Sequence, residues 1–131
     1  MALPIGTQVP FHCTASGKLF MASLSAARRR AFLSSLQMHP LTPNTFTDPA
    51  LLSNELSVIR RRGFSLDQEE FYEGMVAIAV PVTDPHRQFY AALAIHGSTQ
   101  RFSIDDALDK RDLLQDQAAR MGELLFSPAT P

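Results

Sequence analysis

Residues 75–96, MVAIAVPVTDPHRQFYAALAIH, hold two apolar runs on either side of a short polar connection. The connection contains Asp84 and Pro85, which suit the first two positions of a type I turn. Two apolar runs joined this closely predict antiparallel strands, over 75–82 and 88–96. The fold depends on this hairpin, because the segments around it show helical rather than alternating patterns.

The residues before the hairpin predict helices. Small and apolar residues at helical spacing indicate a first helix over 14–24, with Thr14 as its N-cap. A second helix is predicted over 25–37. The segment 39–49, HPLTPNTFTDP, contains three prolines and is therefore predicted to be irregular.

The third helix has the clearest boundaries in the first half of the chain. Asp48 is suited to the N-cap and Pro49 to the first helical position. Gly63 is a natural end, so the helix is predicted over 49–62. Its apolar stripe consists of Leu52, Leu56 and Ile59.

Two further elements complete the pattern. The segment 63–71, GFSLDQEEF, suggests a short strand before the hairpin, and Ser103 with Asp106 resembles a capping box. A single long helix is predicted from Ser103 until the proline-containing end SPATP. Its apolar positions are Ile104, Ala107, Leu108, Leu114, Ala118, Met121 and Leu125. Helices, a hairpin and a final helix in this order favour the α+β class in one domain spanning 1–131.

Composition excludes several classes of protein. Of the 131 residues 45% are apolar and 19% are charged, which is ordinary for a globular domain. The formal net charge of -1 argues against general attraction to nucleic acid. One cysteine excludes an internal disulfide, and no apolar run is long enough for a membrane span. We therefore expect a cytoplasmic protein without a membrane partner.

The stretch HCTASGK, residues 12–18, is rich in small side chains. A phosphate loop is excluded, because it needs glycine at His12 and Ser or Thr at Leu19. Two interpretations remain. The small residues could leave the N–H groups of a helix N-terminus open to an anion, with the charge of Lys18 nearby. Alternatively, they could simply allow a helix to pack closely.

No catalytic or metal motif is convincing. Cys13 has no base that the sequence can place beside it, and a lone cysteine is usually a small apolar residue. The four histidines share no metal-ligand spacing. Asp67, Glu69 and Glu70 are interpreted as solvated carboxylates. The arginine triplets 28–30 and 60–62 are interpreted as solvated faces, the second favoured at a helix C-terminus. We expect no enzyme activity, cofactor or metal.

Three stretches together resemble a known family. These are VPFHCTASGKLFMASL, LSVIRRRGFSLDQEEFYEGMVAIAVPVTD and FYAALAIHG. They resemble, in order and spacing, the C-terminal effector-binding domain of isocitrate-lyase-regulator (IclR) type transcriptional regulators. Thr83 departs from the aromatic residue usual before Asp84. The resemblance implies a GAF-like antiparallel sheet flanked by helices, which is here shortened at its N-terminus.

The resemblance also implies a binding site for a small organic acid. Backbone N–H groups at Ala15 and Ser16 would hold the acid, and Asp67 would be a polar contact. Ala77 stands where the family often has cysteine, while Ala94 and His96 replace frequent serines. The ligand-binding residues implied in this way are Val9, Ala15, Ser16, Asp67, Met75, Ala77, Ala94 and His96. If His96 instead lies at the strand end, its ring faces solvent.

The function expected from the resemblance is regulatory. The chain would bind a small carboxylic acid effector and work as a homodimer or homotetramer. DNA would be bound only through a winged helix-turn-helix domain, which is absent from this chain. The alternative is an oligomerisation module whose degenerate pocket binds no ligand.

Overall fold

A computed structural model describes residues 5–6 and 8–128. Within these residues five helices and three strands follow one another along the chain. They are α1 (Ala15–Ser23), α2 (Ala26–Ser35), α3 (Pro49–Arg62), β1 (Ser65–Gln68), β2 (Met75–Thr83), β3 (Phe89–Ser98), α4 (Ile104–Asp109) and α5 (Arg111–Phe126). This order confirms the predicted α+β class.

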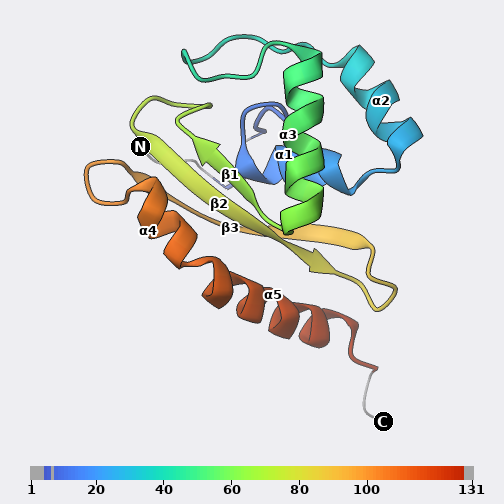
Figure 1. The fold of residues 1–131 in the computed structure, drawn as a ribbon. Helices are drawn as coiled ribbons and strands as arrows, with labels where there is room; N and C mark the ends of the chain where they lie inside the picture. The colour runs from blue at the N-terminus through green and yellow to red at the C-terminus, as the bar shows by residue number, and fades with distance from the viewer. Residues whose placement is uncertain (1–4, 7, 129–131) are drawn as a thin grey trace.

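The strands form one antiparallel sheet in the order β1-β2-β3. β2 pairs with β3 from Met75 opposite Ser98 to Thr83 opposite Phe89. Helices α1, α2 and α3 lie on one side of this sheet, and α4 and α5 lie on the other (Figure 1). The predicted hairpin is therefore the centre of a three-layer domain.

The sequence of β2 explains why both of its faces are covered. Side chains alternate between the two faces of a strand. The small residues Ala77 and Ala79 pack in the apolar cluster with α1 and α3. The larger Ile78, Val80 and Val82 pack in a second cluster with α4 and α5. Small side chains on the α1 side bring that helix close to the sheet, which is where the candidate site lies.

Pro81 lies at a position in β2 that tolerates a missing N–H. Thr99 N donates to the Gly74 carbonyl oxygen at 2.8 Å, so even-numbered residues of β2 bond to β3. Odd-numbered residues, including Pro81, therefore point their backbone groups toward the β1 side. The last β1 pair there is Ser65 opposite Ala79, so Pro81 lies at an unpaired edge.

The turn and the helix caps follow the predictions closely. Arg87 N donates to the Asp84 carbonyl oxygen at 2.9 Å, which closes the predicted Asp-Pro turn. Thr14 and Asp48 cap α1 and α3, and Gly63 ends α3 with a φ of 81°. A side chain would strain that left-handed backbone, so glycine is favoured there.

Three predicted boundaries were wrong. The helix predicted over 25–37 is shorter and runs from Ala26 to Ser35, because the backbone is extended at Leu36. The strand predicted over 88–96 continues through Gly97 to Ser98. The single helix predicted from Ser103 is two helices, α4 and α5, separated at Lys110. The N–H of Lys110 donates to the carbonyl oxygens of Ala107 and Leu108, which tightens the last turn of α4. Ser103 and Asp106 do form the predicted capping box.

Candidate ligand-binding site

A cavity of about 220 Å³ lies between the N-terminus of α1 and the sheet. All eight residues predicted for the ligand site contribute to its wall. The complete lining is Val9, Thr14, Ala15, Ser16, Asp67, Phe71, Met75, Ala77, Ala94 and His96. The structure thus brings together three segments that are far apart in the sequence, 9–16, 67–77 and 94–96.

The first turn of α1 presents free donors to this cavity. Helix N-termini leave their first N–H groups without partners inside the helix. The Thr14 hydroxyl accepts from Gly17 N at 3.1 Å and donates to the Pro10 carbonyl oxygen at 2.7 Å. Among the described residues, no acceptor is bonded to the N–H groups of Ala15 and Ser16. These two groups are available to an anion.

Gly17 has a different reason to be small. A Cβ at this position would lie 2.5 Å from the Cα of Phe11 and 2.6 Å from its carbonyl oxygen. The backbone before α1 therefore crosses directly over Gly17. Close packing therefore explains Gly17, while Ala15 and Ser16 line the cavity, where anion binding stays a prediction.

The sheet supplies the opposite wall. Asp67 pairs with Ala77, and Ala77 pairs with His96, so one residue from each strand forms a row across the sheet. Directly opposed residues of antiparallel strands lie on the same face. Asp67 is 2% exposed, whereas His96 lies on the edge strand and is exposed. His96 therefore both borders the cavity and contacts solvent.

Burial makes Asp67 a weaker acid than usual. Desolvation raises the pKa of its carboxyl to about 6, although N–H groups of Glu70 and Phe71 and the charge of Lys18 oppose this. Asp67 Oδ1 accepts from Glu70 N at 2.8 Å. The raised pKa makes this carboxyl easier to protonate than an ordinary aspartic acid.

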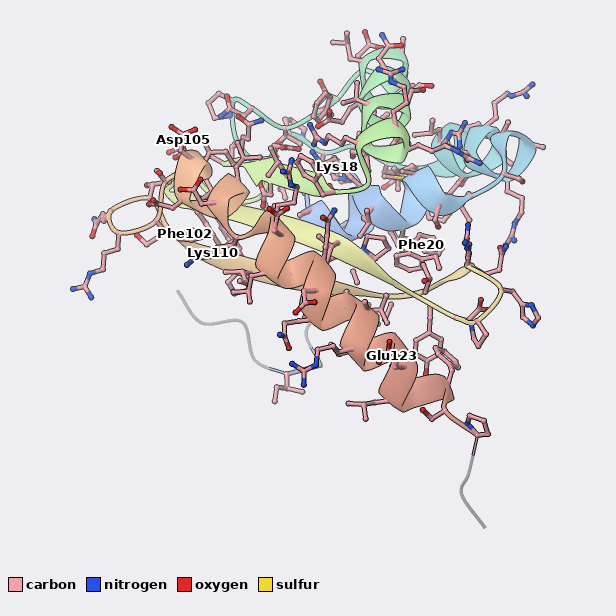
Figure 2. All side chains as sticks on the ribbon, turned by 60° about the horizontal axis from the view of Figure 1, so that its bottom comes forward. Lys18, Phe20, Phe102, Asp105, Lys110 and Glu123 are labelled. Carbon is pink, nitrogen blue, oxygen red and sulfur yellow. The ribbon has the colours of Figure 1, made fainter. Side chains whose placement is uncertain are left out.

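Lys18 is not free to meet an anion in the cavity. Its Nζ lies 2.9 Å from Glu55 Oε2 and 2.8 Å from Glu70 Oε1, and its side chain is fully buried. Lys18 lies in the layer of α1 and α3, on the side of the sheet opposite α5 (Figure 2). The expectation that its charge would assist an anion was wrong, because two carboxylates already hold it.

The carboxylates of residues 67–70 were also placed wrongly in solvent. Asp67 and Glu70 are both buried, and only Glu69 is partly accessible. Burial raises the pKa of Glu70, while the charge of Lys18 and its hydrogen bond to Glu70 lower it. The carboxylates of Glu55 and Glu70 thus hold the ammonium group of Lys18, whose charge also acts on Asp67.

Cys13 is not activated for chemistry. Burial, aided by the negative charges of Asp67 and Glu70, raises the pKa of its thiol to about 12. The thiol is therefore protonated at neutral pH, when a nucleophile needs the thiolate. Among the described residues, no group of three or more His, Cys, Asp or Glu side chains is arranged to hold a metal ion.

The two lining residues that sequence reasoning missed are Thr14 and Phe71. Thr14 was recognised only as a helix cap, although a cap residue necessarily lies beside the free N–H groups. Phe71 carried no signal beyond its place after the carboxylates.

A larger cleft of about 640 Å³ lies between α5 and the end of β2. Its charged lining residues are Asp84 and Glu123, which do not suit an acidic ligand.

The arginine triplets bind the protein itself or face solvent. Arg60 donates to the carbonyl oxygen of Leu24 at 2.9 Å, and Arg62 donates to that of Phe64 at 2.9 Å.

Among the described residues, no helix is long and apolar enough to cross a membrane.

Comparison with known proteins gives consistent relatives. The family model for the bacterial transcriptional regulator IclR C-terminal region matches residues 1–122. The acetate operon repressor of Salmonella typhimurium is 33% identical over 126 residues, covering 96% of this chain and 46% of the repressor. The transcriptional repressor IclR of Escherichia coli is 35% identical over 105 residues, covering 80% of this chain and 38% of the repressor. The chain thus spans less than half the length of these relatives.

A solved structure resembles the fold closely. The inducer-binding domain of a double mutant of the PobR transcription factor from Acinetobacter, in complex with 3-hydroxybenzoic acid, superposes with a TM-score of 0.88. It is 29% identical, and the match covers 92% of this chain and 70% of that one. Both comparisons lead to domains that regulate transcription.

Proposed function

Because this chain belongs to the IclR family of bacterial transcriptional regulators, matching their C-terminal domain, we propose that it senses a small organic acid bound in the α1 cavity. Members of this family are regulators and not enzymes. In the proposed function, the bound acid changes DNA binding by a separate domain. The protein would act as a dimer or tetramer.

The observation that carries the proposal is the pair of free N–H groups at Ala15 and Ser16. They open into the same cavity as the buried Asp67. A helix N-terminus attracts anions through these groups and through the helix dipole. The cavity of about 220 Å³ exceeds the roughly 150 Å³ that holds benzene in an engineered protein cavity. A single-ring acid or a short aliphatic acid therefore fits, and the PobR complex with 3-hydroxybenzoic acid supports this class.

The charges around the cavity restrict the acid further. The negative charge of Asp67 adds to that of Glu70, and Lys18 is already held by Glu55 and Glu70, so a second bare anion beside Asp67 is repelled. The repulsion falls if the ligand donates a hydroxyl hydrogen to Asp67 or if Asp67 takes up a proton. We therefore favour an acid that also carries a hydroxyl group.

Thermal unfolding with a panel of acids tests the proposal. The panel contains benzoate, 3-hydroxybenzoate and short 2-oxo and 2-hydroxy acids. A ligand that binds only the folded chain raises its melting temperature. We expect a hydroxylated acid to give a larger rise than its parent acid. If none of these acids stabilises the chain although it assembles, the alternative of a ligand-free oligomerisation module is favoured.

Two substitutions locate the acid. Ser16→Leu places a bulky side chain at the free N–H groups and is expected to abolish binding. Ser23→Leu is the matched control, because Ser23 is exposed at the other end of α1. His96→Ala is expected to weaken binding by about 1–3 kcal/mol if the imidazole hydrogen-bonds the acid. Unchanged affinity in Ser16→Leu, measured by calorimetry, would exclude this site.

A further inference from the structure

An acid in the α1 cavity brings a second negative charge close to Asp67. Asp67 is 2% exposed and lies on the cavity wall, as do Ala15 and Ser16 with their free N–H groups. A sphere of about 220 Å³ is only about 7.5 Å across, so a ligand carboxylate at those N–H groups lies within about 8 Å of Asp67. Like charges this close repel strongly when little water separates them.

The described residues offer no free lysine or arginine to offset this repulsion. None of the residues that line the cavity is a lysine or an arginine. Lys18, on α1, acts on Asp67 from behind the wall, but its Nζ is already held by Glu55 of α3 and by Glu70. The positive charge near the site is therefore used before a ligand arrives.

The other groups that face Asp67 differ in whether they can take up a proton. The thiol of Cys13, in the segment before α1, already holds its proton, because burial raises its pKa to about 12. Glu70 does not line the cavity, and its carboxylate is bonded to Lys18. His96, on β3, lies in the same row of the sheet and does line the cavity. Asp67 and His96 are thus the two groups on the wall that can become protonated.

A hydrogen placed between the ligand and Asp67 removes most of the repulsion. An ionised carboxylate only accepts hydrogen bonds, whereas a protonated carboxyl also donates one. Burial raises the pKa of Asp67 to about 6, so at pH 7 the empty cavity holds mostly the ionised form and must gain a proton to donate. A ligand hydroxyl group supplies the same hydrogen without any proton from water. A phenolic hydroxyl, with a pKa of about 10, keeps its hydrogen at neutral pH.

We propose that the cavity holds an acid only when one hydrogen lies between the ligand and Asp67. The ligand's own hydroxyl group supplies this hydrogen, or Asp67 takes up a proton when the ligand has no hydroxyl group. The inference rests on the proposed function, in which an acid binds in the α1 cavity. Asp67 is then the residue that sets the specificity of the site, and the specificity depends on pH.

The two kinds of acid should respond differently to pH. An acid without a hydroxyl group binds together with about one proton, so its affinity should fall about tenfold for each pH unit above 7. A hydroxylated acid binds without a proton, so its affinity should change little over the same range. The preference for the hydroxylated acid should therefore be small below pH 6 and grow steadily as pH rises.

Calorimetry of the intact chain with benzoate and with 3- and 4-hydroxybenzoate tests the proposal. Titrations between pH 6 and pH 8.5, in buffers of different ionisation enthalpy, measure both the affinity and the number of protons taken up. All three ligand carboxylates are ionised throughout this range, so the ligands add no proton change of their own. At pH 7.5 we expect benzoate to bind with uptake of about one proton, and the tighter hydroxybenzoate with almost none.

Three variants identify the group that takes up the proton. Asp67→Asn keeps the oxygen that accepts from Glu70 N and adds a permanent N–H donor, so it should bind benzoate without proton uptake and with constant affinity. Glu69→Gln is the matched control, because it removes a carboxylate of the same segment that does not line the cavity. His96→Gln removes the other protonatable group of the wall. Proton uptake with benzoate should persist in both of these variants.

Each possible outcome decides the matter. Equal proton uptake for benzoate and the hydroxybenzoates overturns the proposal and leaves the proposed function standing, and this comparison needs only the parent chain, even if Asp67→Asn fails to fold. Uptake that persists in Asp67→Asn, or that disappears in His96→Gln, overturns the role of Asp67. If none of the acids binds at any pH, the proposed function fails and this inference fails with it.

Discussion

Replacing Lys18 by Met removes the only ammonium group of the buried charge network while keeping a side chain of similar length. Glu70 would then keep its charge in a site where its side chain is 4% exposed. Glu55 is less affected, because its side chain is 18% exposed and reaches water. Breaking a buried ion pair from one side costs about 3–5 kcal/mol. With one partner able to rehydrate, we expect a loss near the lower end, about 3 kcal/mol at pH 7.

The size of the loss should depend on pH. Burial already raises the pKa of Glu70, and removing Lys18 raises it further. As pH rises above the usual pKa of a glutamic acid, the unfolded chain releases this proton before the folded chain does, so the variant loses stability. Near pH 4 both states hold the proton. The deficit of Lys18→Met should therefore be small at pH 4 and largest near neutral pH.

Urea unfolding followed by far-ultraviolet circular dichroism measures the deficit, because the chain has no tryptophan for fluorescence. A loss of about 3 kcal/mol is a large part of the 5–15 kcal/mol typical of a domain, but the variant should still fold. The double variant Lys18→Met with Glu70→Gln should recover part of the loss, since residue 70 then carries no charge that needs Lys18. An equal deficit at pH 4 and pH 7, without recovery in the double variant, would show that Lys18 acts through packing alone.

Three further expectations follow from the cavity and the charge balance. Gly17→Ala should lower the free energy of unfolding by about 1–3 kcal/mol in urea titrations, because its Cβ would overlap the Phe11 backbone; an unchanged midpoint contradicts the close approach. As pH rises from 4 to 7, the free energy of unfolding of Asp67→Asn should increase relative to that of the parent by on the order of 2–3 kcal/mol, because the raised pKa of Asp67 makes the parent less stable over this range. If the two proteins change in stability with pH in the same way, this expectation is contradicted. This chain alone, with its net charge of -1, should give no salt-resistant gel shift with DNA, and a shift on one defined sequence that persists in salt refutes that.

Local signals explain which parts of the fold were predictable. The hairpin depends on an Asp-Pro turn between two apolar runs, and the ends of α3 depend on Asp48 and Gly63. These residues act on their immediate neighbours, so their effect is visible in the sequence. The break at Lys110 has no such signal. It is made by backbone hydrogen bonds to Ala107 and Leu108, which almost any residue at that position forms.

Contacts between residues far apart in the sequence explain what could not be predicted at the site. The family resemblance implied eight ligand-binding residues, and all eight line one cavity, where ligand binding stays a prediction. The buried network was not predicted, because Lys18 meets Glu55 and Glu70, which are 37 and 52 positions away. Without those partners in view, carboxylates in a polar segment are expected in water. The raised pKa of Asp67 follows first from its burial, which is set by the packing of segments far apart in the sequence.

The missing N–H of Pro81 has a consequence for how far any assembly of this chain could grow. Sheets extend into open-ended filaments only when both of their edges accept a strand in turn. On the β1 side the edge is a four-residue strand followed by the Pro81 backbone, which offers no donor at that position. An added strand could therefore not complete its hydrogen bonds at this edge. Growth by strand addition at both edges of the sheet is therefore blocked, so repeated pairing of copies into an open-ended filament is disfavoured.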